Sequence, residues 1–115
     1  MLDRAWRSTV EAEIENIRFY QADAERLPLQ AASIDVALVN GIFNLNPARE
    51  MIFQELARVV RPGGAVYAAE MILREPLSME EFRAAGFQEV KLLRAYRNAR
   101  TKNPLVLAAE VWAKR

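Results

Sequence analysis

Apolar residues in the first third of the chain change from a helical to an extended spacing. Residues 17–22 predict a short strand. After a turn at 31–33, the run from Ile34 to Val39 is almost wholly apolar, which predicts a strand covered on both faces in a parallel sheet. Before them, steps of three and four residues predict a helix with one largely apolar side, made of Leu2, Ala5, Trp6, Thr9, Val10 and Glu13.

The middle of the chain carries the signals of a helix that leads into another strand. Asn46 and Pro47 predict the helix start, with Asn46 as the cap and Pro47 at the first helical position. Pro62 cannot continue this helix, and residues 63–64 predict a glycine turn into a strand at 65–69. The apolar stripe of the helix consists of Ile52, Phe53, Leu56, Ala57 and Val60.

The last part of the chain predicts a short helix followed by two strands. Ser78 and Glu81 have the spacing of a capping box, and Gly86 ends the helix that they begin. Strands are predicted at 87–96 and 105–112, and the polar loop between them indicates an antiparallel hairpin. We therefore predict one α/β domain over the whole chain, with a mostly parallel sheet and a C-terminal antiparallel hairpin.

Composition limits the chemistry that this domain can perform. The chain has 115 residues, of which 52% are hydrophobic and 27% charged, as expected for one domain with a modest core. It contains no Cys and no His, so thiolate and histidine metal sites, a thiol nucleophile and the usual general base are excluded. No apolar run is long enough for a membrane helix or a secretory signal. We expect a cytoplasmic protein with no metal site and no membrane partner.

Basic residues are concentrated in the second half of the chain. Residues 61–115 hold 10 basic and 6 acidic groups, although the net charge of the whole chain is only +1. A basic patch on the final hairpin would meet phosphate or nucleic acid. The alternative is a solvated hairpin and loop, which we favour over a nucleic-acid partner. The residues concerned are Lys91, Arg94, Arg97, Arg100 and Lys102.

Three turns follow predicted strands, where open α/β sheets bind their ligands. After the first strand, the carboxylate of Asp23 can accept a hydrogen bond from an amino group, and the N–H of Ala24 can address a ring nitrogen. After the second, Asn40 and Gly41 offer a short polar side chain and a residue without Cβ, which lets a ligand approach closely. Glu70 follows the third. Each turn also has a purely structural interpretation, because Asp and Gly are common turn residues.

These motifs occur together in one known family. The resemblance is carried by Asp23–Pro28, Ser33–Val36, Val39–Leu45, Leu56–Gly64 and Ala85–Phe87. On these segments the chain resembles class I S-adenosylmethionine-dependent methyltransferases, particularly the group around the ubiquinone/menaquinone and arsenite methyltransferases. The resemblance implies a truncated Rossmann-like sheet, S-adenosylmethionine as cofactor, and transfer of a methyl group to a small-molecule acceptor.

The resemblance also implies roles for individual residues. The turn after the first strand would hold the adenine through a carboxylate and a backbone N–H. The turn after the second strand would lie along the methionine part of the cofactor, near the transferred methyl group. The implied cofactor-binding residues are Asp23, Ala24, Asn40, Gly41 and Ile42, and the implied catalytic residues are Asn40 and Phe43.

Some parts that the resemblance implies have no counterpart in this chain. In the family, two further strands lie between those that correspond to 17–22 and 34–39, and they bring a glycine-rich turn for the methionine part and an acid for the ribose. An open gap would leave buried backbone groups unpaired, at about 1–3 kcal/mol each. We therefore expect either direct pairing of 17–22 with 34–39, or completion by a complementing chain or, as we favour, a homodimer. The alternative function is a catalytically inactive remnant or subunit that acts as an interaction module.

Overall fold

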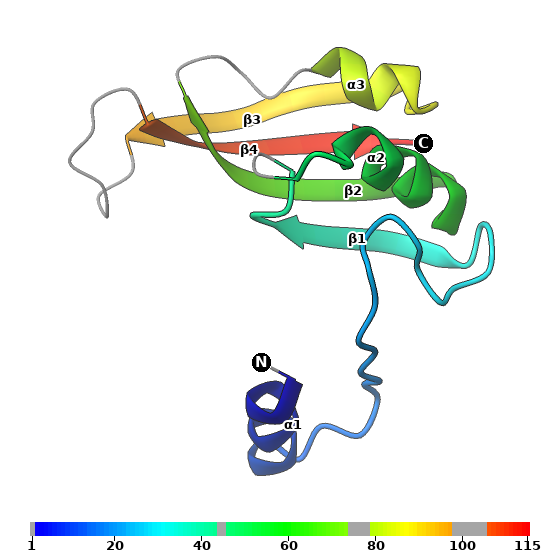
Figure 1. Ribbon diagram of the computed structural model, residues 1–115, viewed down its shortest axis with the longest axis vertical. Helices are drawn as coiled ribbons and strands as arrows, with labels where there is room; N and C mark the ends of the chain where they lie inside the picture. Colours follow the sequence, from blue (N-terminus) through cyan, green and yellow to red (C-terminus); the bar gives the residue numbers. More distant parts are fainter. Residues whose placement is uncertain (1, 44–45, 74–78, 98–105) are drawn as a thin grey trace.

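A four-stranded sheet organises the computed structural model, which describes residues 2–43, 46–73, 79–97 and 106–115 (Figure 1). Among these residues, no helix has the length and apolar character needed to cross a membrane. The elements follow one another as α1 (Leu2–Glu11), β1 (Ile34–Asn40), α2 (Arg49–Val59), β2 (Val60–Leu73), α3 (Met79–Ala84), β3 (Glu89–Arg97) and β4 (Val106–Lys114).

The strands of the sheet lie in the order β1-β2-β4-β3. β1 and β2 pair in parallel, with Leu38 opposite Tyr67. β4 pairs antiparallel with β2 on one side and with β3 on the other. β1, β2 and β3 therefore run in one direction and β4 in the opposite one. This confirms the predicted α/β sheet and its C-terminal antiparallel hairpin, although parallel neighbours are limited to β1 and β2.

Buried phenylalanines join α2 and α3 to one face of the sheet. Phe43 and Phe53 stack with their ring centroids 4.3 Å apart, and Phe82 meets Phe53 edge-on at 4.6 Å. Phe87 extends this cluster against Phe82 at 5.7 Å. None of the four side chains is more than 2% exposed. Each therefore contributes the hydrophobic free energy of a fully buried large side chain, about 1.5–3 kcal/mol.

The helix predicted to start at Asn46 and Pro47 begins slightly later, at Arg49. Asn46 Oδ1 accepts a hydrogen bond of 2.8 Å from the N–H of Ala48, so Asn46 closes the turn before α2 instead of capping the helix itself. Ser78, the cap predicted for the third helix, lies outside the described residues.

β2 begins directly after α2 and lies close to β1 at Gly64. A Cβ on Gly64 would lie 2.7 Å from the carbonyl oxygen of Asp35 and 2.9 Å from that of Arg61, so only glycine fits. The pairing of β1 with β2 shifts its register in this region, between Ile34 and Val36. The predicted turn at 63–64 is therefore an irregularity within the strand and not a break before it.

The prediction of a strand at 17–22 is wrong. These residues belong to no helix or strand, and the predicted direct pairing with 34–39 is also wrong because β1 has only β2 as a neighbour in the described sheet. Figure 1 shows this segment leaving the sheet and leading to α1, which stands apart from it. Residues 36, 38 and 40 on β1 are exposed, so their unpaired backbone groups face water. The energetic cost that argued against an open gap therefore does not arise.

Truncating one ring of the phenylalanine cluster should be strongly destabilising. We expect Phe53→Ala to lower the free energy of unfolding by about 3–5 kcal/mol, because it leaves a cavity beside the rings of Phe43 and Phe82. Met51 is exposed on the same helix. Met51→Ala is therefore the matched control and should change stability by less than about 0.5 kcal/mol. Urea denaturation measures both, and equal losses would contradict this core.

Candidate functional site

The turn that carries Asp23 and Ala24 follows residues 14–22, which belong to no helix or strand. The N–H of Arg26 donates to the carbonyl oxygen of Asp23 at 3.0 Å, and the two residues form an isolated β-bridge. Asp23 is exposed, whereas Ala24 is half-buried and packs against the core. The turn thus presents the Asp23 carboxylate at the surface, while the neighbouring Ala24 anchors the turn to the core.

Asn40 and Gly41 lie at the C-terminal end of β1, as predicted. Asn40 is exposed, and the N–H of Gly41 donates to the carbonyl oxygen of Ala69 at 3.0 Å. Gly41 has a φ of +70°, and a Cβ placed on it would meet no atom of the described chain within 4 Å. The backbone at this strand end therefore has the open space that close approach of a ligand requires.

Ile42 and Phe43 turn from the strand end into the core. Ile42 is half-buried against the core, and Phe43 is 0% exposed, stacked on Phe53. This burial favours a packing role for Phe43 over contact with a reacting methyl group. Of the two residues predicted to be catalytic, Asn40 alone lies at the surface.

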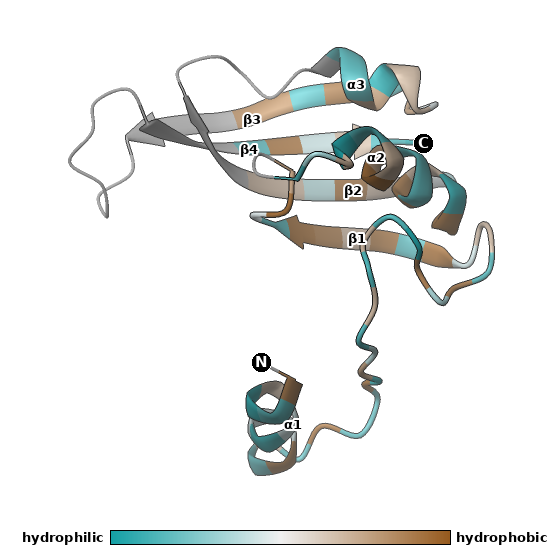
Figure 2. Ribbon diagram, in the orientation of Figure 1, coloured by the Kyte–Doolittle hydropathy of each residue, from teal (hydrophilic) through white to brown (hydrophobic). Residues whose placement is uncertain are grey.

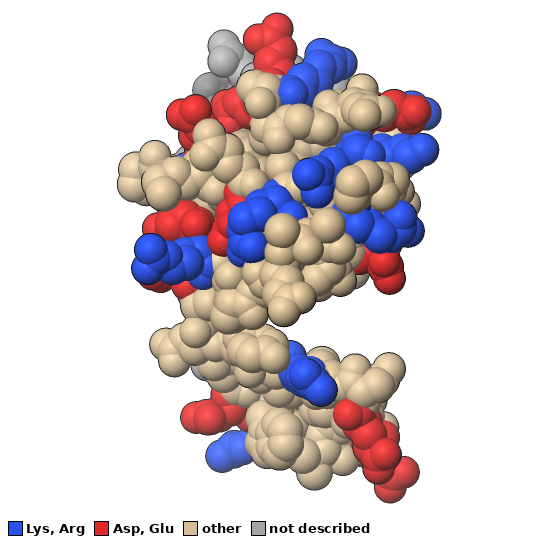
Figure 3. Space-filling view, turned by 90° about the vertical axis from the view of Figure 1, so that its right-hand side faces the viewer, with Lys and Arg blue, Asp and Glu red and all other residues tan. Residues whose placement is uncertain are grey.

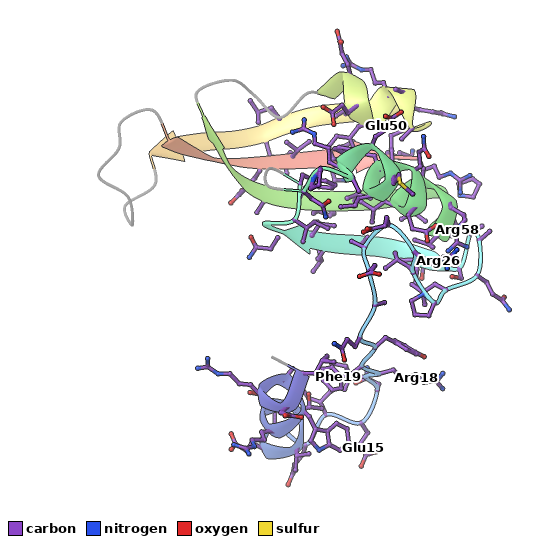
Figure 4. The ribbon with its side chains drawn as sticks, in the orientation of Figure 1. Glu15, Arg18, Phe19, Arg26, Glu50 and Arg58 are labelled. Atoms are coloured by element: carbon purple, nitrogen blue, oxygen red, sulfur yellow. The ribbon has the colours of Figure 1, made fainter. Side chains whose placement is uncertain are left out.

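Two charged side chains of α2, which the sequence reasoning missed, fix the loop after the first turn. The Glu55 carboxylate accepts a hydrogen bond of 2.6 Å from the N–H of Leu27. The Arg58 guanidinium donates to the carbonyl oxygens of Leu29 at 2.9 Å and Leu27 at 3.2 Å, and it also pairs with Glu55. Glu55 and Arg58, here called the α2 clamp, therefore hold the loop against α2. Figure 4 shows Arg26, from this loop, near Arg58.

The α2 clamp is charged at neutral pH. The hydrogen bond from Arg58 lowers the pKa of the Glu55 carboxyl from its ordinary 4.5, the bond from Leu27 acts in the same direction, and desolvation opposes both. The same hydrogen bond raises the pKa of Arg58. The Glu55 side chain is 10% exposed, so it is largely protected from solvent screening. The i, i+3 spacing of opposite charges was the sequence signal that could have revealed this pair.

Different interactions position the predicted site residues Asp23 and Asn40. Asp23 is positioned through the loop that the α2 clamp fixes, and Asn40 through the pairing of β1 with β2. Within the described part of the chain, no hydrogen bond or ion pair joins Asp23 to Asn40. The side chains of Glu70 and of the basic residues between 94 and 102 lie outside the described structure.

A hollow of about 420 Å³ lies between α2 and α3. Phe53 contributes to its wall, and Arg49 crosses from α2 to bind Glu81 on α3, with Nε 2.8 Å from a carboxylate oxygen. Neither Asp23 nor Asn40 lines this hollow. It therefore does not coincide with the predicted cofactor site.

Comparison with protein families gives a match over residues 1–68 to a family model described as a methyltransferase domain. The match includes the turn at Asp23, the end of β1 and the α2 clamp. The chain belongs to the class I S-adenosylmethionine-dependent methyltransferase family. The predicted family is therefore confirmed.

Individual relatives of this methyltransferase chain are considerably longer. An arsenite methyltransferase of Halobacterium salinarum is 29% identical over 76 residues, which cover 66% of this chain and 19% of that protein. The ubiquinone/menaquinone biosynthesis C-methyltransferase UbiE of Acidiphilium cryptum is 37% identical over 65 residues, 56% of this chain and 26% of that one. The chain thus spans about a fifth to a quarter of these relatives.

Solved structures show the same fold. The YcgJ protein from Bacillus subtilis superposes with a TM-score of 0.83 at 16% identity, over 100% of this chain and 78% of that one. The Rossmann-like methyltransferase fold that the sequence predicts is therefore confirmed.

The α2 clamp should make the stability of this methyltransferase chain depend on pH. The folded-state pKa of Glu55 lies below its unfolded value, so its stabilisation is present above 4.5 and is lost as the pH falls through the lowered pKa. We expect Glu55→Gln to lower the free energy of unfolding by about 1 kcal/mol at neutral pH, and this difference to shrink in acid.

Glu50→Gln, on the exposed side of the same helix, is the matched control for charge and is expected to have no such effect. Urea denaturation of the three chains over a series of pH values measures the differences. A deficit of Glu55→Gln that stays constant down to the most acidic pH at which the chains fold would disprove the role of the carboxylate.

Proposed function

We propose that this chain forms the adenine side of an S-adenosylmethionine site and takes part in methyl transfer to a small-molecule acceptor. The observation that carries the proposal is the family match over residues 1–68, a continuous stretch with both candidate turns and the α2 clamp. The names of the two curated relatives refer to arsenite and to ubiquinone/menaquinone biosynthesis. These names support a small molecule, and not a macromolecule, as the acceptor.

The residues present fit the adenine part of the cofactor. Asp23 is an exposed carboxylate that can accept from an amino group, and the α2 clamp fixes the loop that follows it. Ala24 is anchored beside it, and Ile42 offers an apolar side chain near the strand end. At Gly41 the backbone is open to a ligand. In this proposal Asp23 and Ala24 hold the adenine, and the strand end lies along the rest of the cofactor.

These contacts are too few for tight binding by themselves. Hydrogen bonds contribute roughly 0.5–1.5 kcal/mol each, or up to about 3 kcal/mol when one partner is charged. Micromolar affinity requires about 8 kcal/mol. The 40 residues before Gly41 contain no glycine, so no glycine-rich turn among them can hold the methionine part. We therefore propose that a second copy or a complementing chain supplies the remaining contacts.

The chain's part in the reaction is binding and orientation. When bound, S-adenosylmethionine supplies a methyl group attached to a sulfonium, which is transferred by in-line displacement. Such a reaction depends mainly on the relative position of the two reactants, so the absence of His and Cys is no obstacle. Asp23 fixes the adenine, Asn40 orients groups near the methyl, and Phe43 supports this strand end from the core.

One observation favours a different function. Within the described residues, one side of β1 has no strand partner, and such an open strand edge suits an interaction module with no catalytic activity. Such a module would not bind the cofactor, so binding distinguishes the two functions.

S-adenosylmethionine should raise the thermal stability of the protein. A ligand that binds only the folded form at about 100 times its Kd adds about 2.7 kcal/mol to the free energy of unfolding. Asp23→Asn removes a charged acceptor and should weaken binding by roughly tenfold to a hundredfold. Calorimetric unfolding with and without cofactor measures both effects.

Asp3→Asn is the matched control, because Asp3 is exposed on α1. It should leave the response to the cofactor unchanged. A melting temperature that does not respond to millimolar S-adenosylmethionine, at protein concentrations where copies associate, would favour the interaction module instead.

A further inference from the structure

We propose that the open side of β1 accepts a segment of a second copy of this chain that forms no strand of its own. The segment at residues 14–22, here called the arm, would add to the partner's β1 as a new edge strand, and the two copies would exchange arms reciprocally. This inference rests on the proposal that a second chain completes the site, and it identifies the surface through which that happens.

The backbone of β1 has hydrogen-bonding groups on its open side. Directly after the strand, the N–H of Gly41 donates to the carbonyl oxygen of Ala69 on β2. Because the direction of bonding alternates along a strand, residues one, three and five positions earlier point away from β2. These residues are Asn40, Leu38 and Val36. No described strand lies on that side, so their N–H and C=O groups can pair with an added strand.

β1 is also apolar and has exposed side chains. Leu38 is 80% exposed, Val36 is also exposed, and Figure 2 shows hydrophobic residues along most of β1. Asp35 is the one charged residue of the strand, and no Lys or Pro interrupts it. Natural proteins usually protect an edge strand with such residues, so an unprotected apolar edge is a site of strand addition.

The arm has the composition of a strand but no strand partner. Ile17, Phe19 and Tyr20 are residue types that favour extended structure, and Ile17 and Tyr20 are exposed. Phe19 lies against Trp6 of α1, with ring centroids 6.1 Å apart. Figure 4 shows Glu15, Arg18 and Phe19 along this segment, well away from the sheet. The arm thus carries residues that favour a strand but forms no strand in the described structure.

Each copy therefore offers one unpaired strand edge and one strand-favouring segment that has no strand partner. The two do not meet within one chain, because the arm runs from the sheet toward α1 while the α2 clamp fixes the loop at its base (Figure 1). In two copies related by a twofold axis, each arm would pair with the β1 edge of the other copy, which gives a closed dimer. A separate polypeptide would cover β1 but leave the arm unpaired, so the second copy is the better occupant.

The molecule also has room for an added strand. Figure 3 shows a notch between the lobe that holds α1 and the body that holds the sheet. α1, which borders this notch, exposes Trp6 at 59% and also Val10. A strand from a second copy would cover apolar surface of this kind, and such burial favours association.

Disulfide trapping tests the exchange directly, because the chain contains no native cysteine. Each of four arm variants is mixed with Leu38→Cys and oxidised in the absence of cofactor. Paired strands bring Cα atoms within the roughly 4.4–6.8 Å that a disulfide requires, so at least one mixture should give a mixed disulfide dimer. The arm variants are Ile17→Cys, Arg18→Cys, Phe19→Cys and Tyr20→Cys.

Leu93→Cys is the matched control, since Leu93 is an exposed leucine on β3, at the opposite edge of the sheet. It should form no mixed disulfide with the arm variants. Disulfides only between two Leu38→Cys chains would show pairing of β1 with β1 and would overturn the exchange. Equal yields with Leu93→Cys and Leu38→Cys would overturn it too.

Light scattering provides a second test that needs no cysteine. We expect the unmodified chain to form a dimer that dissociates on dilution. Leu38→Lys should raise the Kd of the dimer at least about tenfold, whereas Leu93→Lys should change it by less than about twofold. A strictly monomeric chain at high concentration would overturn the proposal. Neither test uses S-adenosylmethionine, so a failure of cofactor binding leaves their outcome unaffected.

Discussion

A strand that pairs on one side only leaves half of its backbone groups to the solvent, and β1 is such a strand. On its paired side lies the whole packed part of the molecule, where β2, the covering helices and the phenylalanine cluster form one core. On its other side lie the arm and α1, which stands apart from the sheet (Figure 1). At the end of the strand, Gly41 donates a hydrogen bond to β2, whereas the backbone groups of Asn40 point to the open side. The open side is where, in our proposal, a second copy of the chain pairs.

The candidate site is divided in the same way. The end of β1 is held directly by its pairing with β2. The turn at Asp23 is held indirectly, because the α2 clamp binds the loop that follows the turn. Residues before Asp23 have no comparable anchor in the described structure, apart from the contact of Phe19 with Trp6. A second chain paired with β1 would order this side as well. Cofactor binding and association are therefore expected to support each other.

Most of the fold could be predicted from the sequence because its signals are local. The apolar stripe of α2 and the hairpin of β3 and β4 form where their spacing predicts them. The prediction of a strand at 17–22 was wrong because a strand requires a partner, and the residue types that favour extended structure do not supply one. The burial of Phe43 and the α2 clamp depend on contacts between distant segments. The roles assigned to Asp23 and Asn40 remain predictions.

Hydrogen exchange at single residues of β1 tests the central claim, that one side of this strand is open and is covered by association. In dilute protein, the amides of Val36, Leu38 and Asn40 should exchange quickly, while those of Ala37 and Val39 should be protected by β2. At concentrations where copies associate, the first three should become protected as well. Equal protection of both sets in dilute protein, or rapid exchange of the first three in the associated form, would contradict the account.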